Sequence, residues 1–78
     1  MNKFVLLGII EELNDDYIWL RVEDNSTRFS YGTNTFRICI NELEFENIKV
    51  GQHCGVSGYL EPLGHKYAEM NATHIVNF

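Results

Sequence analysis

The sequence predicts an all-β fold: a small, closed, five-stranded Greek-key barrel with one short helix between the third and fourth strands. Three observations predict it. Nearly every stretch between turn residues shows the alternation or the β-branched and aromatic enrichment of a strand. Glycines interrupt the first and fourth stretches, which is typical of strands that coil or bulge in a barrel. One short segment after the third strand carries helix signals instead.

The first three strands are expected at residues 2–13, 17–23 and 35–41. Gly8 interrupts the first and indicates a bulge or a sharp coil. The other two alternate strictly, so one set of side chains points inward. That interior set is Ile18, Leu20, Val22, Phe36, Ile38 and Ile40. The intervening segment 24–34 is rich in Ser, Thr, Asn, Asp and Gly, and we expect a long hairpin loop there.

The helix is expected within residues 41–51. Asn41 is suited to the N-cap, with Glu44 three residues later as in a capping box. Lys49 near the end suits the helix dipole, and Gly51 is a suitable stop. The segment has room for at most about two turns.

The remaining strands are expected at residues 53–61 and 66–78, joined by a turn at 62–64. Alternation in the last strand shifts phase near residues 73–74, which predicts a bulge. An order of three strands, a helix and two strands is that of the OB-fold, whose helix lies between strands three and four. We therefore expect a single OB-fold domain over residues 1–78.

Composition limits the function. The chain has 78 residues, 45% of them hydrophobic, and a net charge of −5, which argues against a protein that grips duplex DNA by phosphate neutralisation alone. No apolar run is long enough to span a bilayer and no cleavage site marks a signal peptide, so we expect a cytoplasmic protein that does not bind membranes. Cys39 and Cys54 are expected to be unpaired and buried or half-buried, with Cys39 facing outward on its strand and Cys54 inward.

Three stretches resemble bacterial single-stranded DNA-binding proteins. The family's opening strand is similar to MNKFVLLGIIEE, with its Asn-basic-apolar start and its interrupting glycine. The family's stretch from the third to the fourth strand is similar to FRICINELEFENIKVGQHCGVSGYLEP, and the closing ATHIVNF is similar to its final strand. The matching residues of the middle stretch are Glu46, Asn47, Gly51, Val56, Gly58 and Leu60.

The resemblance implies an OB-fold that binds single-stranded DNA on the hairpin of strands two and three, in the context of DNA replication. Two departures limit it. The helix region is shorter than in the family. The acidic C-terminal tail by which family members recruit other replication proteins is absent, because the chain ends at Phe78 directly after the last strand. We therefore do not expect recruitment through such a tail.

Alternation leaves aromatic and basic side chains on the outer face of strands two and three, where OB barrels bind oligonucleotides. Aromatic rings stack on bases and guanidinium groups meet phosphates. We expect bases to stack on the aromatic rings, and we expect arginines and Lys3 to meet phosphates. The expected nucleic-acid-binding residues are Tyr17, Trp19, Arg21, Arg37 and Asn41 on the strands and Arg28, Phe29 and Tyr31 in the loop.

An alternative from another class stays open. Exposed Trp, Tyr and Arg are also enriched at subunit interfaces, so the same face is compatible with an OB-fold protein-interaction or assembly subunit. Small domains with exposed aromatics often self-associate, and we expect a homo-oligomer. No catalytic motif is present, and we expect neither an enzyme nor a bound cofactor or metal. The expected ligand is single-stranded DNA, with RNA as the second choice.

Overall fold

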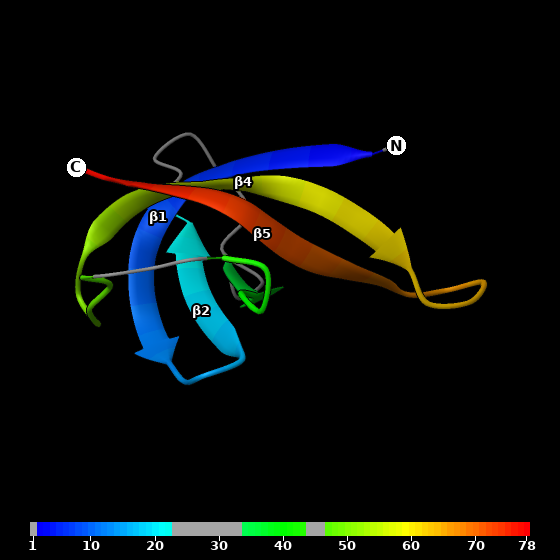
Figure 1. Cartoon of the computed structure of the whole chain (residues 1–78), viewed down its shortest axis with the longest axis horizontal. Helices are drawn as coiled ribbons and strands as arrows, with labels where there is room; N and C mark the ends of the chain where they lie inside the picture. Colours follow the sequence, from blue (N-terminus) through cyan, green and yellow to red (C-terminus); the bar gives the residue numbers. More distant parts are fainter. Residues whose placement is uncertain (1, 23–33, 44–46) are drawn as a thin grey trace.

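The computed structural model describes residues 2–22, 34–43 and 47–78, and its five strands close into a barrel in the order β1-β2-β3-β5-β4 (Figure 1). β3 and β5 run parallel, and every other neighbouring pair is antiparallel. The predicted all-β class and all five strands are confirmed. Their bounds are β1 Lys3–Leu13, β2 Tyr17–Val22, β3 Thr35–Cys39, β4 His53–Pro62 and β5 Ala68–Asn77.

β1 belongs to both sides of the barrel because it coils at its middle. Its N-terminal half pairs with β4, and its C-terminal half pairs with β2 (Figure 1). Gly8 takes part in both ladders, opposite Cys54 on one side and Val22 on the other. A β-carbon at Gly8 would overlap the carbonyl oxygen of Arg21, so the close approach of β1 and β2 admits only glycine here.

Two bulges adjust the ladders. In β5 the register passes from Ser57 opposite His74 to Gly58 opposite Ala72, which leaves Thr73 as the extra residue. The bulge predicted near residues 73–74 is therefore confirmed. β1 bulges against β2 between Ile10 and Glu12, a shift that the sequence did not reveal.

Aliphatic side chains from all five strands fill the barrel. Six residues of β2, β3 and position 40 were predicted to face the interior. Four of them, Ile18, Leu20, Ile38 and Ile40, are buried, and Val22 is half-buried against the core. Phe36 was predicted inward but is 39% exposed. It is the second residue of β3, ahead of Ile38 and Cys39, the two residues of this strand that pair with β5, and alternation alone does not ensure that the core covers a side chain there. The fully buried large side chains are Ile10, Ile18, Leu20, Ile38, Ile40, Cys54 and Val56.

The helix predicted within residues 41–51 is not seen. The described residues on both sides of 44–46 form turns and bends, and 44–46 lie outside the described residues. Asn47 has a φ of 71°, in the left-handed region that a right-handed helix excludes. So short a segment gains little from helix propensity, and here burial of single side chains decides its course.

Side chains of the described parts of this segment, residues 40–43 and 47–52, pack in the barrel core, and we call these parts the plug. The N–H of Leu43 donates to the carbonyl oxygen of Ile40 at 3.0 Å, which makes a tight turn directly after β3. Leu43 and Ile48 are each 9% exposed and pack in the core. These two residues therefore reach the core although the predicted helix is not seen.

Both cysteines are free and buried, as predicted. Cys54 lies inside the core with no exposed surface, and burial raises the pKa of its thiol. Cys39 shares the outer register of β3 with Arg37 and pairs with Tyr17, yet only 6% of it is exposed because neighbouring side chains cover it. Among the described residues no helix is long and apolar enough to cross a membrane.

Candidate functional site

The predicted aromatic and basic residues of β2 and β3 share one face of the barrel. Tyr17 lies opposite Cys39, Trp19 lies opposite Arg37, and Arg21 lies opposite Thr35. Side chains directly opposite each other in an antiparallel pair lie in contact range on the same face. We call this the β2–β3 face, with Tyr17, Trp19, Arg21, Thr35 and Arg37 as its members.

Tyr17 and Arg37 form the most ordered contact on the β2–β3 face. The guanidinium carbon of Arg37 lies 4.6 Å from the centroid of the Tyr17 ring, which is cation–π geometry. The hydroxyl of Tyr17 donates to Glu69 Oε1 at 2.9 Å. That hydrogen bond and the negative charge of Glu69 raise the pKa of the tyrosine hydroxyl. The Tyr17 side chain is thus held at its hydroxyl by Glu69 and over one face of its ring by Arg37.

Trp19 is half-buried between two ladders. Arg37 lies opposite it on β3 and Glu12 lies opposite it on β1. A half-buried indole keeps part of its ring accessible while the strand fixes its orientation. Tyr17, Arg37 and Trp19 thus share one face across two strands, and we call these three residues the strip.

Arg21 is engaged differently. Its Nε lies 2.8 Å from Glu11 Oε1, and both side chains are about half exposed. The Thr35 hydroxyl also reaches the second oxygen of Glu11, at 3.5 Å. Glu11 is the residue added by the bulge in β1, so that bulge supplies the counter-charge. Arg21 therefore offers less positive charge to a ligand than its position in the sequence indicated.

A polar row continues this face across the barrel. Tyr17 lies opposite Cys39, Cys39 opposite Asn71, and Asn71 opposite Tyr59. Asn71 is 7% exposed, and its amide donates to Glu61 Oε2 at 3.3 Å. The close approach of β3 to β5 buries the two central members of the row.

Tyr59 ends the row with a second tyrosine–carboxylate contact. Its hydroxyl donates to Glu42 Oε1 at 2.8 Å, and this hydrogen bond raises the pKa of Tyr59 to about 12. The contact ties the turn after β3 to β4.

The other predicted site residues are placed less closely or not at all. Asn41 was expected at the end of the third strand, but β3 ends at Cys39, and Asn41 is exposed in the turn that follows. Arg28, Phe29 and Tyr31 lie outside the described residues. Sequence reasoning missed Glu11, Glu42, Glu61 and Glu69, since nothing in local patterning shows which carboxylates the barrel brings beside the β2–β3 face.

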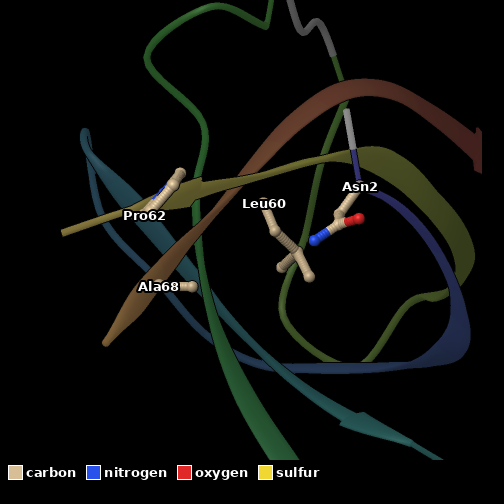
Figure 2. Close-up of a pocket in the computed structure, with 4 residues that line it drawn as sticks. All are labelled: Asn2, Leu60, Pro62 and Ala68. Carbon is tan, nitrogen blue, oxygen red and sulfur yellow. The ribbon is translucent and has the colours of Figure 1, made fainter. Parts of the chain in front are cut away.

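A separate hollow of about 380 Å³ opens beneath the hairpin of β4 and β5. It is lined by Asn2, Leu60, Pro62 and Ala68, and the Asn2 amide lies beside the Leu60 side chain (Figure 2). The carbonyl oxygen of Asn2 accepts a hydrogen bond from the Leu60 N–H at 2.8 Å, which holds the chain start against β4. Its lining is polar and apolar in nearly equal measure, and it belongs to other strands than the β2–β3 face.

Among the described residues no group of three or more His, Cys, Asp or Glu side chains has an arrangement that could hold a metal ion. No protein-family model matches the sequence, and no curated protein matches it significantly. The resemblance to bacterial single-stranded DNA-binding proteins therefore stays a prediction.

Proposed function

We propose that this protein is a non-enzymatic OB-fold protein that binds single-stranded DNA through the β2–β3 face with little sequence preference. The strand order supports the OB-fold, because a five-stranded barrel closed by a parallel contact of β3 and β5 is compatible with a Greek-key OB barrel. Residues 40–43 and 47–52 occupy the place of the OB helix as an irregular plug. The resemblance of three stretches to bacterial single-stranded DNA-binding proteins supports the same fold and ligand.

One observation carries the ligand assignment: Arg37 lies over the Tyr17 ring and directly opposite Trp19. Bases of any sequence can stack on such a strip because every base has a π-face. Arg37 also presents a cation at the strip for the phosphate that follows a stacked base. This combination of stacking surface and single cation is the arrangement that sequence-tolerant single-strand binding requires.

The charges around the strip set how it would bind. Arg21 is paired with Glu11, and Glu69 lies at the hydroxyl end of Tyr17. Few phosphates would be neutralised on the described residues of this face, so few counterions are released on binding. Stacking then supplies most of the affinity, and binding depends weakly on salt.

The test is anisotropy of a labelled single-stranded oligonucleotide with the wild type and two variants. Trp19→Ala should lose about 1–3 kcal/mol of binding free energy, the usual value of one stacked base. Tyr67→Ala is the matched control: Tyr67 is 74% exposed, and its hairpin between β4 and β5 projects away from β2 (Figure 1). It should bind like the wild type.

The alternative, a protein-interaction face, predicts other results. The wild type would then show no oligonucleotide binding even at low salt, and Trp19→Ala would instead change the assembly mass in sedimentation. An RNA oligonucleotide of the same sequence, tested in parallel, shows whether binding prefers DNA. Circular dichroism of each variant checks that the barrel is intact, because Trp19 is half-buried.

A further inference from the structure

A second surface, on the outside of β1, β4 and β5, exposes an unusual amount of apolar side chain. Val5 and Leu7 of β1 are 72% and 54% exposed, and Val76 and Phe78 at the end of β5 are 60% and 74% exposed. The ladders place them together, since Leu7 lies opposite Gly55 and Gly55 lies opposite Val76. We call Val5, Leu7, Val76 and Phe78 the apolar patch.

The apolar patch surrounds a hollow. A hollow of about 260 Å³ lies against the patch, lined by its four members and by Gly55, Val56 and Ser57. Its floor is at Gly55, where a side chain would come within 3.1 Å of Leu7 Cδ2 and 3.5 Å of Phe78 Cζ. Val5, the more exposed of the two β1 members, stands beside it. A twofold axis would bring the apolar patch of each copy against the apolar patch of the other, as an isologous contact requires.

The charge pattern favours a second copy as the occupant. The chain carries a net charge of −5, yet residues 3–9, 53–59 and 72–78 hold no Asp or Glu side chain. Two copies of an acidic protein can therefore approach through this surface with little repulsion at the contact itself. A second copy would also present the same exposed apolar side chains to this surface.

The exposed area suits a small dimer interface. Taking roughly 150–220 Å² for a large apolar residue in the open, the four exposed fractions amount to about 450 Å² per copy. Stable interfaces bury at least about 600 Å² per partner, and a polar rim normally supplies part of it. Lys3, Ser57 and His74 lie along this rim. We propose that the protein forms a twofold homodimer through the apolar patch, which leaves the β2–β3 face free.

Sedimentation velocity over a micromolar to submillimolar range tests the proposal without any nucleic acid. The wild type should sediment as a dimer at the upper end of the range. Leu7→Glu should raise the dimer dissociation constant by at least about tenfold, because the symmetric contact would bury two unpaired carboxylates. Leu63→Glu is the matched control: Leu63 is 53% exposed but lies in the hairpin between β4 and β5, and this variant should remain dimeric.

Phe78→Ser is the second variant, in case Leu7→Glu fails to fold. Residue 78 follows the last strand, and its backbone N–H still donates to the His53 carbonyl oxygen. A wild type that stays monomeric throughout the range overturns the proposal. So does a dimer that both patch variants leave as stable as Leu63→Glu does, or one that Trp19→Ala dissociates instead. Because no oligonucleotide is present, failure here is independent of failure of the proposed binding function.

Discussion

Gly58 offers a sharp test of how the barrel is closed. A β-carbon at this position would overlap the carbonyl oxygen of Asn71 and would lie 2.8 Å from the Asn71 carbonyl carbon and 2.9 Å from Ala72 Cα. All three are backbone atoms of β5 beside the bulge at Thr73, so no side chain can move aside. Gly58→Ala must therefore push β4 and β5 apart where they are closest.

The magnitude follows from that geometry. Overpacking costs about 1–3 kcal/mol even where side chains can adjust, and each weakened ladder hydrogen bond adds about 1 kcal/mol. We expect Gly58→Ala to lower the free energy of unfolding by about 3–4 kcal/mol. A domain of this size has roughly 4–12 kcal/mol in total, so this is a large share. The thermal midpoint should fall by at least about 12 °C.

Gly55→Ala is the control on the same strand. Its β-carbon would meet only the ends of the Leu7 and Phe78 side chains, at 3.1 and 3.5 Å, and both can move. We expect a change within about 1 kcal/mol, of either sign, because alanine also restricts the unfolded chain. Urea unfolding of dilute protein, followed by the fluorescence of the single tryptophan, gives both values. If the two variants differ by less than about 1 kcal/mol, backbone closure at Gly58 is not the constraint described here.

Three further predictions concern the core, the thiols and pH. Ile38→Ala should cost about 2–5 kcal/mol in urea unfolding because this side chain has no exposed surface, and a loss under 1 kcal/mol would contradict its central position. Cys39 and Cys54 should react slowly with a thiol reagent in the native protein and yield two thiols per chain on unfolding without reductant, whereas none would indicate a disulfide. Tyr59 has a pKa raised from 10.0 to about 12 by Glu42, so it contributes stability below pH 10 that is lost as the pH rises towards 12. Tyr59→Phe should flatten that loss, and equal pH profiles for the two proteins would refute the assignment.

Strand alternation was sufficient to predict the inner face of β2. This strand is paired along its length with β1 on one side and β3 on the other, which holds it in the barrel wall. Ile18 and Leu20 have no exposed surface, as expected. The same rule gave the wrong environment for Phe36, which lies ahead of the β3 residues that pair with β5. Alternation gives direction, whereas burial also depends on which elements extend past a given position.

The plug after β3 shows a second limit. Asn41 and Gly51 are suited to begin and end a helix, and both positions are indeed turns. The pattern could not show that Leu43 and Ile48 both pack in the barrel core. Local signals for a cap and a stop also suit an irregular turn, and over so few residues tertiary burial outweighs helix propensity.

The candidate site was predictable in its aromatic members and unpredictable in its charges. Tyr17, Trp19 and Arg37 share a face because each strand has a period of two, and that period can be read from the sequence. Glu69 is 52 residues from Tyr17 along the chain, and the two meet only because β5 closes the barrel beside β3. Glu11 meets Arg21 through a bulge that leaves no distinctive residue type in the sequence.

These carboxylates determine how a single strand would have to lie on the β2–β3 face. Glu69 occupies the hydroxyl end of Tyr17 and Glu11 neutralises Arg21, so a phosphate placed at either would meet negative charge. Arg37 lies over the Tyr17 ring and opposite Trp19, and a phosphate placed beside it would meet positive charge. A strand that stacked its bases on Tyr17 and Trp19 would thus have its backbone nearest Arg37 and directed to solvent elsewhere. In that pose the bases contribute most of the affinity, and the acidic composition of the chain is compatible with binding nucleic acid.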